Sequence, residues 1–86
     1  MKFAEQLGSN LAYCRRRAGL SQEELSFRAS IHPTNVGMIE CGKRMPKVDT
    51  VVKLAGALGI PTEELLDGLT WSPAGYEPGE FTELSD

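Results

Sequence analysis

The sequence predicts an all-helical domain built around two short helices that a tight turn joins, between residues 20 and 46. Two observations lead to this fold class. Apolar residues recur every three or four positions, which is the spacing of a helix face. Residues that begin and end helices also stand where these apolar runs start and stop. The length of 86 residues is that of a single domain.

A continuous apolar stripe predicts the first helix, over about residues 2–18, and Gly19 closes it. The members of the stripe are Phe3, Leu7, Leu11, Cys14 and Ala18. Cys14 is therefore interpreted as a small core residue. The spacing of Cys14 and Cys41 does not match a zinc site, and we expect two reduced thiols and no bound metal.

The first helix of the central pair begins after Ser21. Glu24 stands three residues further on, and this spacing is that of a capping box, in which each residue bonds the backbone N–H of the other. Leu25 and Ala29 then repeat at helical spacing. The sequence therefore predicts a short helix from about residue 22.

Pro33 opens the second helix of the pair, because a proline at the first helical position loses no hydrogen bond. Val36 and Ile39 give this helix one apolar edge, and Gly42 suits its C-terminal cap. At about 100° per residue, the opposite face carries no charge. That face holds Thr34, Gly37, Met38 and Cys41.

Basic residues surround this uncharged face in the sequence. They are Arg28, Lys43, Arg44 and Lys47. A small neutral face with a cationic rim suits insertion into a duplex groove, with the rim on phosphates. An ordinary surface helix of unremarkable composition is the alternative, and periodicity alone leaves both interpretations open.

The charge is distributed unevenly along the chain. Residues 1–60 hold nine basic and five acidic side chains, whereas residues 61–86 hold seven acidic and no basic side chains. The net charge of −3 is therefore the sum of +4 on residues 1–60 and −7 on residues 61–86. This asymmetry indicates a nucleic-acid-binding part joined to an acidic segment.

Two further helices are expected over about residues 48–58 and 62–66, and the composition changes after them. We predict a domain over residues 1–69 and an acidic, aromatic extension over residues 70–86. Prolines and glycines forbid a long helix in the extension, yet its apolar residues suggest that it docks on its own domain or on a second copy. These residues are Trp71, Tyr76, Phe81 and Leu84. The expected dimerisation residues are Leu65, Leu66, Leu69 and Trp71.

The chain resembles the Cro and phage-repressor type of helix-turn-helix protein, the Xre family. The resemblance covers roughly residues 3–69 and is carried by LSQEEL at 20–25, Val36, IECGKR at 39–44, Pro46, TVVKLAGALGI at 50–60 and TEELL at 62–66. It implies a five-helix lambda-repressor-like domain whose second and third helices form the helix-turn-helix. It also implies a transcriptional regulator that binds double-stranded DNA, usually as a homodimer.

The same resemblance implies roles for single residues. The base-facing positions are Pro33, Thr34 and Met38, with Asn35 alongside. Contacts to the DNA backbone are expected from Gln22, Arg28, Lys43, Arg44 and Lys47. Arg15 is expected to pair with Glu40 and to hold the first helix to the third. Ser30 stands where the family usually has glycine.

These observations favour a DNA-binding regulator, either a repressor or a restriction-modification controller. An antitoxin-like or other protein-interaction module, whose acidic aromatic tail binds a partner, is the alternative. An enzyme is disfavoured because the sequence offers no Ser-His-Asp set, no Gly-rich phosphate loop and no metal cluster, and we expect no cofactor. No apolar run approaches the length of a membrane span, and a cytoplasmic location is expected.

Overall fold

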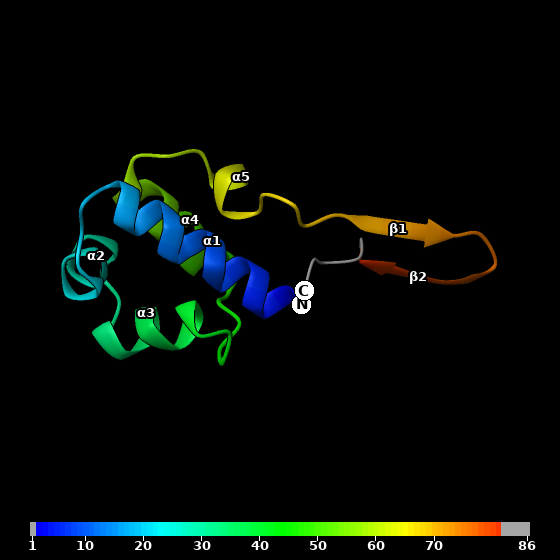
Figure 1. Ribbon diagram of the computed structural model, residues 1–86, viewed down its shortest axis with the longest axis horizontal. Coiled ribbons are helices and arrows are strands. Elements are labelled where there is room, and N and C mark those ends of the chain that lie inside the picture. Colours follow the sequence, from blue (N-terminus) through cyan, green and yellow to red (C-terminus); the bar gives the residue numbers. More distant parts are fainter. Residues whose placement is uncertain (1, 82–86) are drawn as a thin grey trace.

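The computed structural model describes residues 2–81, which form five helices followed by a two-stranded hairpin (Figure 1). The elements are α1 (Phe3–Arg17), α2 (Gln22–Ala29), α3 (Pro33–Glu40), α4 (Val48–Leu58), α5 (Thr62–Leu65), β1 (Trp71–Ala74) and β2 (Glu77–Phe81). The five-helix prediction is confirmed, with bounds within one residue or so of those expected. Leu84, which was expected to dock, lies outside the described residues. None of the helices within residues 2–81 has the length and apolar character needed to cross a membrane.

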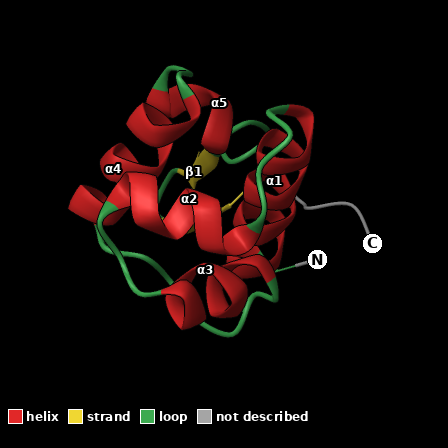
Figure 2. Ribbon diagram, turned by 90° about the vertical axis from the view of Figure 1, so that its left-hand side faces the viewer, coloured by secondary structure: helices red, strands yellow, loops and turns green. Residues whose placement is uncertain are grey.

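The helices pack around one apolar core, with α2 between α3 and α4 and with α1 beside them (Figure 2). Every helix contributes at least one buried side chain to this core. The most deeply buried apolar residues are Leu11, Leu25, Val36, Ile39, Leu54 and Leu65. The core therefore fixes the orientation of α3, because Val36 and Ile39 must point inward.

The turn between α2 and α3 is built from the residues that the sequence singled out. Ser21 Oγ accepts from the Glu24 N–H at 3.0 Å, and Glu24 Oε1 accepts from the Ser21 N–H at 2.9 Å, so the capping box is present. Ser30 ends α2 in the left-handed region, at φ 56°. Among residues 2–81 it is the one non-glycine residue with positive φ. At the start of α3, His32 Nδ1 accepts from the Thr34 N–H at 3.1 Å.

A glycine allows α1 and α3 to approach unusually closely. Gly8 is buried in α1, and a Cβ added there would lie 2.3 Å from the backbone oxygen of Ile39. Such a distance is shorter than any ordinary contact, so no larger residue fits without moving α3. The position of α3 therefore depends on the absence of a side chain at residue 8.

The extension forms an antiparallel hairpin that projects from the helical part (Figure 1). Trp71 pairs with Phe81, and the two rings meet edge to face with centroids 5.1 Å apart. The Phe81 ring also packs against Phe3 of α1, at 4.7 Å between centroids. The sequence analysis correctly excluded a long helix here but did not predict strands.

Candidate nucleic-acid interface

Helix α3 carries the four predicted base-facing residues, which we call the recognition face: Pro33, Thr34, Asn35 and Met38. Thr34 and Met38 lie opposite the core-facing Val36 and Ile39, and Pro33 and Asn35 lie on the flanks. Pro33 and Thr34 are exposed, whereas Asn35 and Met38 are half-buried. Neither Thr34 nor Met38 is enclosed in the core of the monomer, because Val36 and Ile39 occupy the inward positions. The recognition face therefore consists of small or apolar groups and one amide, with no charged side chain.

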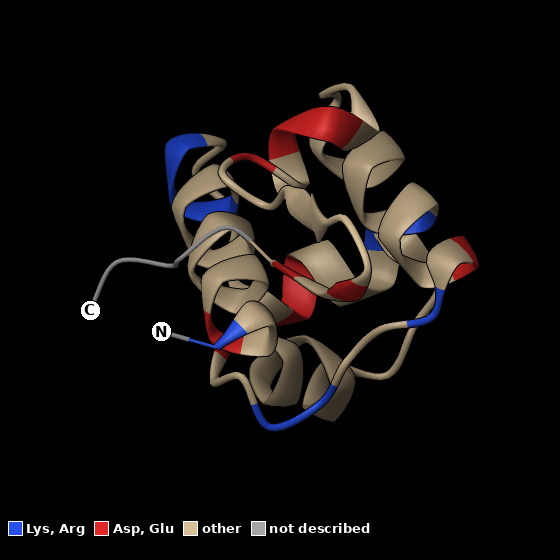
Figure 3. Ribbon diagram, turned by 90° about the vertical axis from the view of Figure 1, so that its right-hand side faces the viewer, with Lys and Arg blue, Asp and Glu red and all other residues tan. Residues whose placement is uncertain are grey.

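The loop over residues 42–47, here called the basic loop, leads from α3 to α4 and carries three exposed cations (Figure 3). They are Lys43, Arg44 and Lys47. The start of the loop is tied to α3, because the Gly42 N–H donates to Ile39 O at 3.0 Å and the Lys43 N–H donates to Met38 O at 2.9 Å. These backbone bonds hold the cations of the basic loop beside the recognition face.

A hydrogen bond joins one of the residues predicted to face the bases to one of those predicted to contact the DNA backbone. Arg44 Nη1 donates to Asn35 Oδ1 at 2.9 Å. Asn35, Arg44 and Lys47 also line one surface hollow of about 340 Å³, which is completed by Met45, Pro46, Asp49 and Thr50. Arg28 is exposed on α2 and borders another hollow, beside Phe27 and the acidic residues Glu23 and Glu24. The structure thus joins the basic loop to α3 and places Arg28 at a different hollow.

A part-buried ion pair fastens the C-terminal end of α3 to α1. Arg15 Nε lies 2.6 Å from Glu40 Oε2, and Arg15 Nη2 donates to Glu40 Oε1 at 3.1 Å. The two side chains are only 11 % and 7 % exposed. The hydrogen bond to Glu40 raises the pKa of Arg15 above its ordinary value, so the guanidinium stays charged. Arg15 Nη1 also donates to Leu20 O at 2.8 Å, which ties in the chain before α2.

Gln22 extends this network to the first turn of α2. Its Nε2 donates to Glu40 Oε1 at 3.0 Å. A Cβ added at Gly37 would lie 3.5 Å from Gln22 Oε1, so the glutamine side chain rests beside α3. Glu40 therefore connects α1, α2 and α3 through Arg15 and Gln22. These contacts fix the orientation of α3, and with it the recognition face, relative to α1 and α2.

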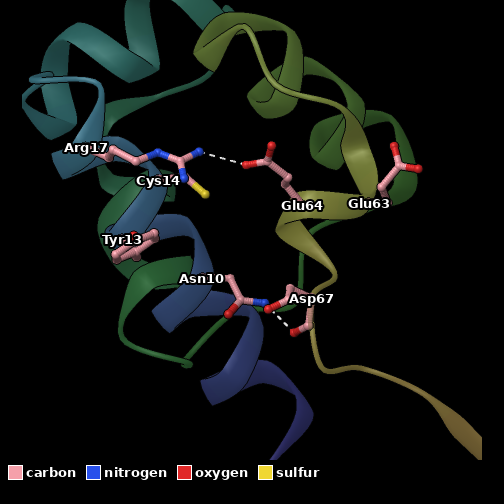
Figure 4. A pocket seen from close by; sticks show the side chains of 7 residues that line it. All are labelled: Asn10, Tyr13, Cys14, Arg17, Glu63, Glu64 and Asp67. Carbon is pink, nitrogen blue, oxygen red and sulfur yellow. Dashed lines mark hydrogen bonds and ion pairs between the residues drawn. The ribbon is translucent and has the colours of Figure 1, made fainter.

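A cleft of about 290 Å³ lies between α1 and α5, where no sequence motif had pointed (Figure 4). Arg17 Nη2 bridges it to Glu64 Oε2 at 2.7 Å, and Asn10 Nδ2 donates to the backbone oxygens of Leu65 and Asp67 at 2.9 Å each. Burial raises the pKa of the Cys14 thiol at this cleft, which keeps the thiol protonated. The contacts hold α5 on α1, on the side opposite α3 (Figures 1 and 2).

The predicted dimerisation residues fall in different environments. Leu65 is 1 % exposed and belongs to the core of the monomer, so the prediction that its side chain contacts a second copy is wrong. Helical spacing around α5 gave no hint of this, because α5 has only four residues. Leu66 and Trp71 are exposed, and Leu69 is half-buried against the core.

Together, five helices with a helix-turn-helix at α2 and α3 define a lambda-repressor-like domain, and comparison with known proteins agrees. The chain belongs to the HTH_3 family of helix-turn-helix proteins, whose model matches residues 11–65. It is a helix-turn-helix transcriptional regulator. Within residues 2–81, no group of three or more His, Cys, Asp or Glu side chains is placed to hold a metal ion.

Two curated relatives are similar over much of the chain. The first is the uncharacterized HTH-type transcriptional regulator y4dJ of Sinorhizobium fredii, which is 37 % identical over 75 residues, or 87 % of this chain and 97 % of the relative. The second is the control protein C.BamHI of Bacillus amyloliquefaciens, 37 % identical over 54 residues, or 63 % of this chain and 67 % of the relative. These proteins are described as a regulator and a control protein, not as enzymes.

The structure also resembles solved regulators. The restriction-modification controller protein C.AhdI of Aeromonas hydrophila superposes with a TM-score of 0.71 at 37 % identity, over 72 % of this chain and 94 % of that chain. The hypothetical transcription factor NHTF from Neisseria superposes with a TM-score of 0.72 at 29 % identity, over 76 % of this chain and 75 % of that chain.

Proposed function

We propose that this regulator binds double-stranded DNA as a homodimer, with α3 in the major groove, and that it acts as a repressor or a restriction-modification controller in the cytoplasm. One observation carries the proposal: the uncharged recognition face adjoins a loop that holds three exposed cations. A neutral ridge can enter a groove without repelling phosphates, while the neighbouring cations neutralise the two walls.

The recognition face favours few direct base contacts. Pro33 has no N–H to donate, and Met38 offers only apolar contact. The Thr34 hydroxyl can donate or accept, and its methyl group suits the methyl group of thymine. Because so few side chains of the recognition face can bond to base edges, sequence specificity also depends on the shape of the DNA and on the spacing of two half-sites.

A dimer supplies that spacing. Leu66, Leu69 and Trp71 lie along the chain from α5 into β1, and Leu66 and Trp71 are exposed. We propose that this apolar strip contacts the same strip of a second copy, as a two-fold interface requires. The similarity to C.AhdI and C.BamHI supports the controller assignment, because each match reaches 37 % identity.

The decisive experiment measures duplex affinity against salt concentration, using sequences selected from a random pool. Each phosphate that the protein neutralises contributes a slope of about −0.9 to log K against log salt. Lys43→Gln should lower the affinity and reduce the slope by about one unit per monomer. Lys53→Gln, which removes a cation of α4 outside the basic loop, is the matched control and should leave the slope unchanged. An affinity of the parent protein that hardly changes with salt would contradict groove binding.

A second role is favoured by the exposed aromatic residues of the hairpin. Tyr76 at its tip is fully exposed, and Trp71 and Phe81 are about half-exposed. If Trp71→Ser remains a dimer in sedimentation, Trp71 is not needed for the dimer, and its exposed ring stays available to a different protein, as in the antitoxin-like alternative. If the variant becomes monomeric, the hairpin belongs to the dimer interface.

A further inference from the structure

The hairpin of β1 and β2 has two unlike faces. Trp71 and Phe81 are paired across the strands, so their side chains lie on one face, and their ring centroids are 5.1 Å apart. The indole also lies over Gly79, where an added Cβ would come within 2.7 Å of Trp71 Nε1. Ser72 and Glu80, the next pair, lie on the opposite face because side chains alternate along a strand. We call the side of Trp71, Gly79 and Phe81 the aromatic face.

The aromatic face is open to solvent. Trp71 is 56 % exposed and Phe81 is 47 % exposed. Phe3 of α1 touches the Phe81 ring at 4.7 Å between centroids, and the rest of the hairpin projects away from the helices (Figure 1). A hairpin of two strands is only marginally stable in water unless further strands or a helix pack on it. The aromatic face therefore lacks the cover that the stability of the hairpin requires.

The edges and the charges of the hairpin restrict what can cover this face. Each strand contains a proline, Pro73 in β1 and Pro78 in β2, and a proline in an edge strand disfavours pairing with a further strand. The charged residues between 70 and 81 are Glu77, next to the turn, and Glu80, on the opposite face. Both carboxylates repel DNA, whereas the aromatic face itself carries no charge. The surface that fits this face is apolar and packs on its side chains, not along its edges.

A second copy of the same chain supplies such a surface, and the size of the proposed dimer contact favours it. In the apolar strip of Leu66, Leu69 and Trp71, Leu66 is 38 % exposed and Leu69 is half-buried. Because a large aromatic side chain buries about 150–250 Å² in full, the half-exposed Trp71 offers on the order of 100 Å². A specific interface needs about 800 Å² on each partner, which three such side chains do not provide. Trp71 belongs to both the strip and the aromatic face, so the adjoining apolar area lies on the hairpin.

We propose that the aromatic face forms the larger part of the homodimer interface, with the hairpins of two copies packed face to face across a two-fold axis. This inference rests on the proposed homodimer and deepens it, because it assigns the contact to one of the two faces of the hairpin. It adds Phe81 to the interface. Two-fold packing places two uncharged faces against each other and leaves Glu80 of both copies in water.

Sedimentation equilibrium of matched variants tests this assignment. Phe81→Ser removes a ring from the aromatic face, whereas Tyr76→Ser removes a fully exposed ring from the tip of the hairpin. Phe81→Ser should raise the dimer dissociation constant by about tenfold or more, because two-fold symmetry removes the ring twice. Tyr76→Ser should stay within about twofold of the parent, and so should Ser72→Glu, which adds a charge to the opposite face. A parental dissociation constant in Phe81→Ser would overturn the inference, and so would an equal loss in Ser72→Glu.

The parent protein offers a second readout that does not depend on how a variant folds. Trp71 is the only tryptophan of the chain, so its fluorescence and its quenching by acrylamide report on the aromatic face. On dilution through the dimer–monomer transition seen in sedimentation, the emission should shift to longer wavelength and quenching should increase, with the same midpoint. Unchanged fluorescence through that transition would overturn the inference, leave the homodimer intact and free the face for a different protein. A parent protein that is monomeric at every concentration would refute the homodimer itself.

Discussion

Replacing Gly8 with alanine places a methyl group where the backbone of α3 already lies. The new Cβ would be 2.3 Å from Ile39 O and 2.7 Å from Glu40 O, whereas ordinary contacts begin at 3.4 Å. The helices must therefore separate by about 1 Å, the difference between 3.4 and 2.3 Å. Crowding of this kind costs about 1–3 kcal/mol, and the better helix propensity of alanine offsets about 1 kcal/mol. Because both obstacles are backbone atoms, we expect the upper end of the range and a net loss of about 2 kcal/mol.

Gly56→Ala is the matched control. Gly56 is exposed within α4, and a Cβ added there meets nothing within 4 Å. The same substitution should therefore stabilise the protein by up to about 1 kcal/mol. Urea denaturation of both variants gives the two free energies of unfolding on the same scale. The close approach of α1 and α3 would be refuted if Gly8→Ala proved as stable as Gly56→Ala.

Three further substitutions, one of them paired with a control substitution, test the helix ends and contacts around α2 and α3. Arg15→Ala removes the charged partner of the part-buried Glu40, which keeps its bond from Gln22, and should cost about 3 kcal/mol in urea denaturation. A variant of parental stability would show that the ion pair does not stabilise the fold. Ser30→Gly relieves the left-handed backbone and should stabilise the protein by about 1 kcal/mol, whereas Ser9→Gly within α1 should destabilise it by about 0.5 kcal/mol. Hydrogen bonds from its capping partner lower the pKa of Glu24. The stability that ionised Glu24 contributes is therefore fully present above its ordinary pKa and is lost as the pH falls through the lowered pKa. Glu24→Gln should consequently flatten the acid limb of a curve of unfolding free energy against pH.

Local signals in the sequence were sufficient to predict the helices. The capping box of Ser21 and Glu24 and the proline at the start of α3 act within one turn, so sequence order alone reveals them. The inward positions of Val36 and Ile39 follow from helical spacing, and they leave the recognition face outward. The pairing of Arg15 with Glu40 joins residues that are 25 positions apart. It was anticipated from the resemblance to a family and not from spacing.

Features that depend on tertiary packing were not predicted. Pro73 and Pro78 argue against strands, yet both lie in the hairpin, where two-stranded pairing leaves many N–H groups unused. The burial of Leu65 depends on how α5 lies against α1, which Asn10 and Arg17 determine through side-chain contacts. The helical spacing of apolar residues in the sequence does not predict side-chain contacts of this kind. The bond between Asn35 and Arg44 likewise arises only when the basic loop folds back on α3.

The measurement that most directly tests the central claim adds one negative charge to the recognition face. Thr34→Glu places a carboxylate on an exposed position of α3, and Val52→Glu places the same group on an exposed position of α4. Fluorescence anisotropy with the selected duplex gives both dissociation constants at one salt concentration. If α3 enters the groove, Thr34→Glu weakens binding by about tenfold or more, while Val52→Glu stays within about twofold of the parent. Equal losses in the two variants would contradict the claim.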